Sequence, residues 1–389
     1  MSEARRTSKA VLLQVHSVVG LTLALLWALI GISGATMSFE DEIEASLNAS
    51  MTRVEARAAP RLTPDELVAR LPTEFGKVSA VTMASDPAAA VRIRFARTGD
   101  GAQPSSVYVD PHDGHILGSP CGEAFFATVR KLHRWLLLPG DGNGYGRTIT
   151  GVAALCLIVM LISGLVLRWP HRAGSVGMWL KPNLVLRGRG LHRSLHAVVG
   201  TWVLPVYLVT TLTGLWYSFE WYKGSANWLL ARPSAVTAKQ PKAPRGAAAT
   251  DTGPLTFDRA WSTFLHDQGS RFTTAQLTLP AAGAGTAVRV RSWAKDSTLE
   301  SVRDEFRIDA VTGRAISSDL YADKTFGERV LAGVLDIHRG AILGWPGKLA
   351  FMLAAALMPL FTVTGFLLYL SRRRHRRLAR KPLSLVPGE

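Results

Sequence analysis

Two stretches of the chain decide its fold, because they share the same motifs at both ends. Residues 16–40 read HSVVGLTLALLWALIGISGATMSFE, and residues 196–220 read HAVVGTWVLPVYLVTTLTGLWYSFE. Both begin with a histidine, continue with Val-Val-Gly and end with Ser-Phe-Glu. Each is apolar and long enough to cross a bilayer, which takes about 20 residues. A repeat of this kind predicts a duplicated architecture.

The segments that follow these helices also occur twice. Helix starts are expected at 62–65 and 255–258, alternating strands at 90–94 and 287–291, and hairpin turns at 108–114 and 307–313. In each turn an aspartate follows a strand and a glycine comes three or four residues later, as is typical of a hairpin. Each copy therefore predicts a small α+β lobe with antiparallel strands.

A His-Arg pair and a second apolar run close each copy. The pairs are His133-Arg134 and His338-Arg339, and the apolar runs follow at 149–169 and 349–370. Gly146-Arg147 matches Gly347-Lys348 before these runs, and Ser163-Gly164 matches Thr364-Gly365 inside them. Glycines in the apolar runs are expected to let helices pack closely or to leave space for a flat ligand.

The expected fold is an all-α bundle of four transmembrane helices with two periplasmic α+β lobes, made by a tandem duplication in parallel orientation. The first copy has a cytoplasmic N-terminus (1–9), a transmembrane helix (10–39), a lobe (40–130), an outer His-Arg segment (131–148) and a second helix (149–169). A basic cytoplasmic loop (170–195) leads to the third helix (196–219), a lobe (220–335), a His-Arg segment (336–348), the fourth helix (349–370) and a basic cytoplasmic tail (371–389). Residues 233–254, rich in Pro and Ala, are expected to be a flexible insert.

The distribution of charge predicts the orientation in the membrane. The net charge is +16, but segments 38–146 and 219–346 together hold 27 basic and 27 acidic residues, so they balance. The short segments 1–10, 168–195 and 371–389 hold 16 basic residues and two acidic ones. This excess beside helix ends follows the positive-inside rule, so we expect an inner-membrane protein with cytoplasmic termini and no nucleic-acid partner. The first apolar run exceeds the apolar region of a signal peptide, so we expect it to be retained.

The pattern resembles the PepSY-associated transmembrane-helix family over almost the whole chain. The resemblance is carried by the hairpins at Asp110 and Asp309, the two His-Arg pairs, and the histidines that open the first and third helices. It implies PepSY-like lobes and similarity to inner-membrane haem proteins that reduce ferric siderophores in the periplasm.

Four histidines form two pairs related by the repeat. His16 and His196 lie just inside the cytoplasmic ends of their helices, and His133 and His338 lie at the outer surface. A titratable group inside a membrane is a functional hypothesis by default. Each pair has the ligands for a bis-histidine haem b, so we expect two haems with these four histidines as axial ligands. The alternative is that they are interfacial anchors or packing residues, and His192, one turn before His196, is an alternative inner ligand.

Basic residues accompany the outer histidine pair. Arg134, Arg339, Arg147 and Lys348 are candidate partners for haem propionates. The structural alternative is that they are anchors whose charges extend to the lipid surface.

These observations favour a ferric-chelate reductase, and the resemblance implies siderophore-bound iron as its substrate class. The cytoplasmic segments are too short for a nucleotide or flavin domain, so a quinol or a separate cytoplasmic reductase must donate the electrons. The alternative is a PepSY-type binding or regulatory membrane protein without redox activity. A transporter ranks third, because the sequence shows neither a broken helix nor an acidic residue at the membrane midplane.

The charge distribution makes a direct prediction of topology. Reporter fusions at Ala89 and Ala249 are expected to be periplasmic, and fusions at Ser175 or after Glu389 cytoplasmic. Paired phosphatase and fluorescent-protein fusions measure this. A cytoplasmic signal from position 89 or 249 would contradict the arrangement.

Overall fold

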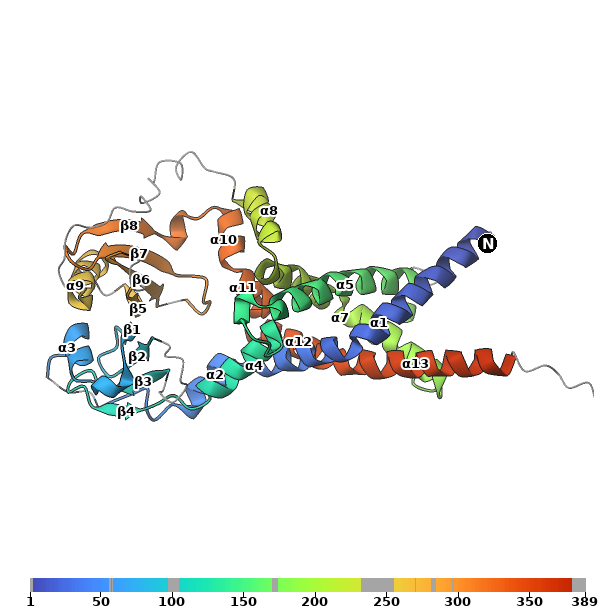
Figure 1. The fold of residues 1–389 in the computed structure, drawn as a ribbon, viewed down its shortest axis with the longest axis horizontal. Helices are drawn as coiled ribbons and strands as arrows, with labels where there is room; N and C mark the ends of the chain where they lie inside the picture. Colours follow the sequence, from blue (N-terminus) through green and yellow to red (C-terminus); the bar gives the residue numbers. More distant parts are fainter. Residues whose placement is uncertain are drawn as a thin grey trace, which may run out of the picture. The chain divides into compact units, whose positions relative to one another are not determined.

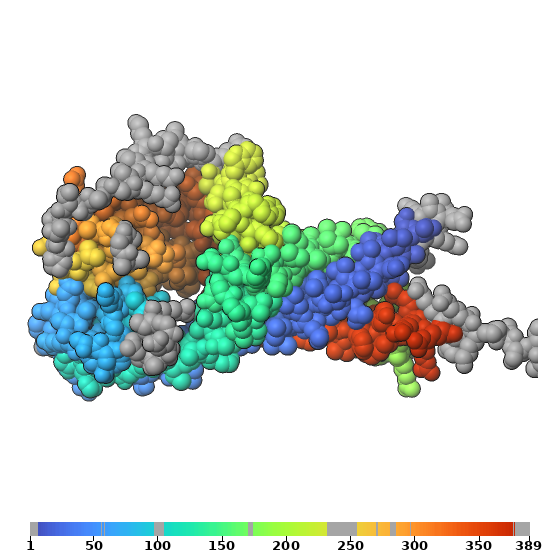
Figure 2. Space-filling view, viewed as in Figure 1, coloured from blue at the N-terminus to red at the C-terminus, as the bar shows by residue number. Residues whose placement is uncertain are grey.

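The computed structural model describes residues 3–55, 57, 59–96, 105–169, 174–231, 255–269, 271–280, 285–295 and 297–379. The chain forms two compact units. One, built from residues 1–39, 126–224 and 337–389, contains the long helices, and the other, built from residues 40–125 and 225–336, contains all eight strands (Figures 1 and 2). The expected insert at 233–254 lies outside the described residues.

The helical unit contains four segments long and apolar enough to span a membrane. They are Thr7–Met37, Tyr145–Arg168, Arg189–Ser218 and Ala341–His375. The corresponding helices are α1 (Glu3–Met37), α5 (Tyr145–Arg168), α7 (Arg189–Ser218), and α12 (Gly344–Ala356) with α13 (Met358–Ala379). In Figures 1 and 2 the blue α1 lies along the green α5. The chain is therefore a membrane protein with four candidate spans, as the hydropathy predicted.

The middle of the bundle contains two polar aromatic side chains at matching positions of the repeat. Trp27 on α1 donates from Nε1 to the carbonyl of Ala153 at 3.1 Å. Tyr207 on α7 donates from its hydroxyl to the carbonyl of Ala354 at 2.7 Å. Both donors are buried and satisfied, as an apolar environment requires. Different residues thus make the same type of contact in the two sequence copies.

The fourth span contains a local irregularity near its middle. Helix α12 ends at Ala356 and α13 begins at Met358, so the irregularity lies at Leu357. Pro359 has no N–H, and its ring clashes with a carbonyl four residues earlier, which kinks an α-helix. Gly31 lies against the kink, where an added Cβ would be 2.7 Å from the carbonyl oxygen of Ala355. Leu357 keeps right-handed helical backbone angles and its N–H still donates to the carbonyl of Leu353 at 3.1 Å, so this span is one kinked helix.

The strands form one antiparallel sheet in the order β4-β3-β2-β1-β5-β6-β7-β8, which can be followed along the labels in Figure 1. They are β1 (Val78–Ala84), β2 (Val91–Phe95), β3 (Ser106–Val109), β4 (Ile116–Gly118), β5 (Phe272–Thr278), β6 (Ala287–Ala294), β7 (Asp304–Asp309) and β8 (Ala315–Asp319). The sequence predicted two lobes. The structure joins them through β1 and β5, which pair from Ala80 opposite Thr278 to Ala84 opposite Thr274.

Two helices on the same side of the sheet complete this domain. They are α3 (Pro64–Ala69) and α9 (Phe257–Gln268), at the expected helix starts (Figure 1). Leu67 from α3, and Phe257 and Phe264 from α9, are almost completely buried. They belong to a single hydrophobic core that continues across both halves of the sheet. The two halves are therefore one domain.

Short elements make up the remaining connections. The helices are α2 (Glu40–Leu47), α4 (Glu123–Trp135), α6 (Val176–Leu180), α8 (Glu220–Leu230), α10 (Phe326–Ala332) and α11 (Val334–His338). Single 3-10 turns lie at Thr73–Phe75, Asp141–Asn143, Tyr321–Asp323 and Ala341–Leu343.

Helices α3 and α9 cap each other. Asp65 accepts hydrogen bonds from the backbone N–H groups of Phe257 and Asp258 at 2.9 and 3.0 Å. Asp258 accepts from the N–H of Asp65 at 2.8 Å and from the hydroxyl of Thr63 at 2.7 Å. The first N–H groups of a helix have no partner within the helix, and a carboxylate there also interacts favourably with the helix dipole. Each half of the domain therefore supplies hydrogen-bond acceptors for the first N–H groups of the helix in the other half.

We predict that Asp65→Ala loosens the start of α9, which belongs to the other half. Loss of such a cap costs about 1 kcal/mol. Hydrogen–deuterium exchange of peptides covering Phe257 and Asp258 should become about five-fold faster. Asp267→Ala is the control, because the side chain of this exposed aspartate contacts only the neighbouring His266 among the described residues. Unchanged exchange in Asp65→Ala would contradict the reciprocal capping.

Candidate functional site

The helical unit brings the four repeat-related histidines together as two pairs. The ring centroids of His16 on α1 and His196 on α7 are 6.5 Å apart, with 75° between the ring planes. Those of His133, near the end of α4, and His338, at the end of α11, are 6.3 Å apart, also with 75° between planes. The two pairs thus have nearly the same geometry. Each joins one histidine from each sequence copy.

Every one of these rings is held through Nδ1 by a hydroxyl on another helix. The contacts are His16 to Ser163 at 2.8 Å, His196 to Thr364 at 2.8 Å, His133 to Ser33 at 3.1 Å and His338 to Thr213 at 2.8 Å. Ser163 and Thr364 occupy matching positions of the repeat, and so do Ser33 and Thr213. The bundle therefore repeats one histidine–hydroxyl contact four times.

The hydroxyls determine which ring nitrogen carries the proton. Each hydroxyl already lies within donating distance of a carbonyl of its own helix: Ser163 to Met160 at 3.2 Å, Thr364 to Leu360 at 2.6 Å, Ser33 to Leu29 at 2.8 Å and Thr213 to Val209 at 2.6 Å. A hydroxyl has one hydrogen, so its oxygen accepts from the imidazole. Nδ1 is therefore the protonated nitrogen, and the Nε2 lone pair is left available.

His133 gives independent support for this tautomer. Its Nδ1 also lies 3.0 Å from the carbonyl oxygen of Ile30, which can only accept a hydrogen bond. Among the described residues, Nε2 of none of the four histidines has a protein hydrogen-bond partner. A histidine that donates from one nitrogen to the protein and offers the other has the arrangement of a metal ligand.

A glycine follows each of the four hydroxyl residues and lies against the same ring. A Cβ added to Gly34, Gly164, Gly214 or Gly365 would lie 3.1, 3.3, 3.7 or 3.7 Å from Cε1 of His133, His16, His338 or His196, respectively. The first two of these distances are shorter than ordinary contacts. A Ser/Thr-Gly dipeptide thus supplies both the acceptor and the space for one imidazole. The sequence contained this signal, but the glycines were interpreted only as packing positions or ligand space.

The outer pair lies outside the four candidate spans, and burial determines its charge. Desolvation lowers the pKa of both His133 and His338 to about 4. Because these values lie well below neutral pH, both rings are uncharged under physiological conditions. The neutral imidazole is also the form that ligates a metal.

His192 is not part of either pair. It lies on α7 one turn before His196 and is half-buried. Its ring makes no contact with the ring of His16 in the described part of the chain, whereas that of His196 does. The geometry therefore favours His196 as the partner of His16.

The four basic candidates have different surroundings. The Arg134 guanidinium lies 5.0 Å from the ring of Trp135 and 5.5 Å from that of Tyr217, and the Tyr217 ring lies 6.4 Å from His338. Arg147 donates to the carbonyl of Tyr217 at 2.8 Å and forms an ion pair with Glu220 at 2.6 Å.

Arg339 and Lys348 contact the end of the first span. Arg339 donates to the carbonyl of Met37 at 3.5 Å, and the buried Lys348 lies 5.2 Å from the ring of Phe39. Arg134 is connected to the outer pair through Tyr217, whose ring it shares with His338. Burial, together with neighbouring Arg130 and Arg147, lowers its pKa, and no carboxylate pairs with it among the described residues.

Comparison with known proteins agrees with the resemblance inferred from the repeated motifs. Residues 13–372 match the family described as PepSY-associated TM region. No curated protein has a significantly similar sequence. The matched region covers nearly the whole chain and contains all four paired histidines. The chain therefore belongs to the PepSY-associated TM region family.

Proposed function

We propose that this protein is an electron carrier of the bacterial inner membrane, with haem b held at each of its two histidine pairs. The observation that carries the proposal is a shared contact: four half-buried imidazoles each place Nδ1 against a Ser or Thr hydroxyl and leave Nε2 without a protein partner among the described residues. Packing histidines would have no need to leave the same nitrogen unpaired four times. Two axial ligands per haem would use all four.

The distance between paired rings fits this cofactor. Two metal–nitrogen bonds of about 2 Å each, with a ring centre about 1 Å beyond each nitrogen, require centroids about 6 Å apart. The observed separations are 6.5 and 6.3 Å. The glycines beside the rings keep side chains out of the same space. When bound, a bis-histidine haem supplies a reversible one-electron change without an open coordination position.

The chain's own residues have three roles in this proposal. The Ser and Thr hydroxyls hold the ligand tautomer and orient the rings, as outer-shell groups do at metal sites. The apolar bundle excludes water from the inner pair. Arg134, which lies near the outer pair through Tyr217 and has no carboxylate partner in the described structure, is suited to an acidic group such as a propionate.

The proposal includes a parallel tandem duplication with both termini in the cytoplasm and the sheet domain in the periplasm. The sequence repeats support it, and so do the matching contacts of His16 with Ser163 and His196 with Thr364. The concentration of basic residues in the short segments supports the orientation. The inner pair would then lie near the cytoplasmic face and the outer pair near the periplasmic face.

The proposed reaction is the reduction of ferric iron, bound by a siderophore or another chelator, on the periplasmic side. One electron converts Fe(III) to Fe(II), which siderophores bind much more weakly, so reduction releases the metal. Electrons come from a quinol or from a separate cytoplasmic reductase. The resemblance of the sequence motifs to haem proteins that reduce ferric siderophores supports this substrate class.

Loss of single ligands tests the cofactor assignment. The purified protein is expected to show reduced haem b bands after dithionite. His16→Ala and His196→Ala should remove the same half of the haem, and His133→Ala and His338→Ala the other half, because each haem needs both ligands. Haem content and optical spectra measure this.

The exposed His375, in the basic end of α13, provides the control as His375→Ala. Wild-type haem content in all four ligand variants would contradict the assignment, and a colourless wild-type protein would favour the binding or regulatory function. Loss of the inner haem in His192→Ala but not in His196→Ala would move that ligand by one turn.

The acceptor is tested with the reduced protein. Under anaerobic conditions, a ferric hydroxamate siderophore is expected to reoxidise the dithionite-reduced protein, with ferrous iron trapped by a chromogenic chelator in a one-to-one ratio to electrons lost. His133→Ala should lose the reaction while keeping the inner haem. If reduced protein reacts with a quinone but with no ferric chelate, iron reduction is not its activity.

A further inference from the structure

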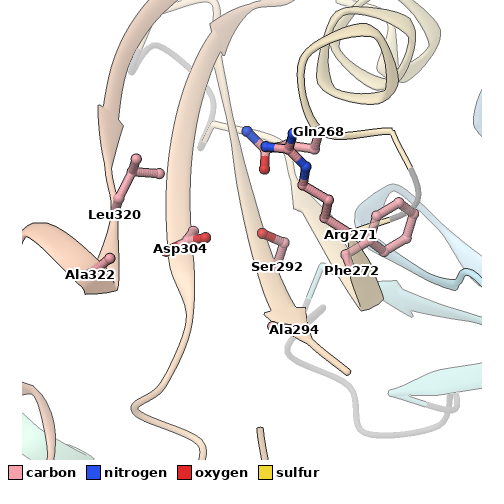
Figure 3. A pocket seen from close by; sticks show the side chains of 8 residues that line it. All are labelled: Gln268, Arg271, Phe272, Ser292, Ala294, Asp304, Leu320 and Ala322. Atoms are coloured by element: carbon pink, nitrogen blue, oxygen red, sulfur yellow. The ribbon is translucent and has the colours of Figure 1, made fainter. Parts of the chain in front are cut away.

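The sheet domain contains a cleft that the proposed electron transfer does not use. It has a volume of about 260 Å³, and its lining includes Gln268, Arg271, Phe272, Ser292, Asp304 and Leu320 (Figure 3). A water occupies about 30 Å³ of liquid, so the space corresponds to roughly nine waters. This is enough for a small organic molecule.

The cleft exists because one core position is small in the second half of the domain. Strand β6 directs Val288, Val290 and Ser292 into the core, since alternate residues of a strand share a face. Helix α9 ends at Gln268, and this last residue of the helix lines the cleft together with Ser292. The core is therefore open at this end of the sheet.

The first half of the domain provides an internal comparison. The repeat aligns β2 with β6, and Phe95 stands where Ser292 stands. Phe95 is 5% exposed and stacks on Phe75 with centroids 5.3 Å apart. Two aromatic rings thus occupy in one half the position that is hollow in the other. If position 292 served only to pack the core, we would expect an apolar residue there and not a serine.

Polar groups without protein partners line the hollow. Ser292 is 5% exposed, and its hydroxyl has no hydrogen-bond partner among the described residues. The hydroxyl lines the cleft, so a ligand group there could form a hydrogen bond with it. Arg271 directly precedes β5 and has no ion-pair partner in the described part of the chain. Asp304 uses Oδ1 to accept from the N–H of Tyr321 at 2.7 Å, and its other oxygen has no hydrogen-bond partner in the described part of the protein.

The arrangement combines one cation, one carboxylate and an apolar wall. Figure 3 shows Gln268 and Arg271 on one side of the cleft, and Ser292 and Asp304 on adjacent strands. Arg271 and Asp304 do not form an ion pair with each other, so each remains able to bind a ligand charge. Phe272 and Leu320 add apolar surface. A ligand that matches carries a carboxylate, a hydrogen-bond donor and an aliphatic part.

We propose that this cleft binds a small amino or hydroxy carboxylic acid. Its carboxylate pairs with Arg271, because a guanidinium recognises a carboxylate through two parallel hydrogen bonds. Its ammonium or hydroxyl group donates to Asp304, and its aliphatic part contacts Phe272 and Leu320. The proposal does not depend on haem binding, since every residue in it belongs to the sheet domain.

Isothermal titration calorimetry of the full-length protein in detergent tests the ligand class with four probes of one size. L-leucine and 2-hydroxy-4-methylpentanoate are expected to bind. The acid 4-methylpentanoate, which lacks the donor, should bind about ten-fold more weakly, as loss of one charge-assisted hydrogen bond predicts. The amine 3-methylbutylamine, which lacks the carboxylate, should not bind detectably. Equal affinity for leucine and 4-methylpentanoate, or no heat from any probe, would overturn the proposal.

Three variants test the site. Ser292→Phe restores the aromatic side chain of the matching position and should abolish binding by filling the cleft. Arg271→Gln changes an exposed residue and should weaken leucine binding about ten-fold. Lys77→Gln is the matched control, because Lys77 directly precedes β1 as Arg271 precedes β5, and it should leave affinity unchanged. Wild-type affinity in Arg271→Gln would show that the cleft is not the binding site, even if Ser292→Phe failed to fold.

Discussion

An imidazole placed in an apolar helix bundle must find an acceptor for its N–H, and this requirement organises the helical unit. Each paired histidine donates from Nδ1 to a Ser or Thr hydroxyl, and the hydroxyl donates to its own helix. These contacts join α1 to α5 and α7 to α13 through His16 and His196. They join α4 to α1 and α11 to α7 through His133 and His338. The same bonds that hold the helices together therefore also define the site, since they leave Nε2 of all four rings available.

Strand pairing and helix capping join the two halves of the sheet domain. Strands β1 and β5 pair across its centre, and the helix of each half receives its N-terminal cap from an aspartate of the other. Helix α3 also has its own capping box of Thr63 and Glu66, but the start of α9 depends on Asp65 of the other half, so the domain is expected to unfold as one unit. The two halves differ in their core packing at one matching position. Phe95 fills the core of one half, whereas Ser292 leaves a polar hollow in the other.

Matching positions in the two sequence copies preserve contacts better than they preserve residue types. Trp27 and Tyr207 both donate to a carbonyl of another helix, although one uses an indole N–H and the other a phenol. Ser163 and Thr364 likewise make one contact with different side chains. A buried donor or acceptor is costly when unpaired, so the partner is constrained more strongly than the size of the residue. The repeat therefore extends beyond the short identical motifs, because positions with different residues make equivalent contacts.

The sequence by itself determined the four apolar spans, the helix starts at Thr63 and Thr256, the hairpins at Asp110 and Asp309, and the membership of the family. These features depend on local patterns: hydropathy, capping residues and turn chemistry. Only the tertiary structure decided that the two halves share one sheet, because strand pairing between β1 and β5 joins residues almost 200 positions apart. It also decided the role of the Ser/Thr-Gly dipeptides and the kink at Leu357. A hydroxyl in an apolar run looks like any other small helix residue until the ring that it binds is placed beside it.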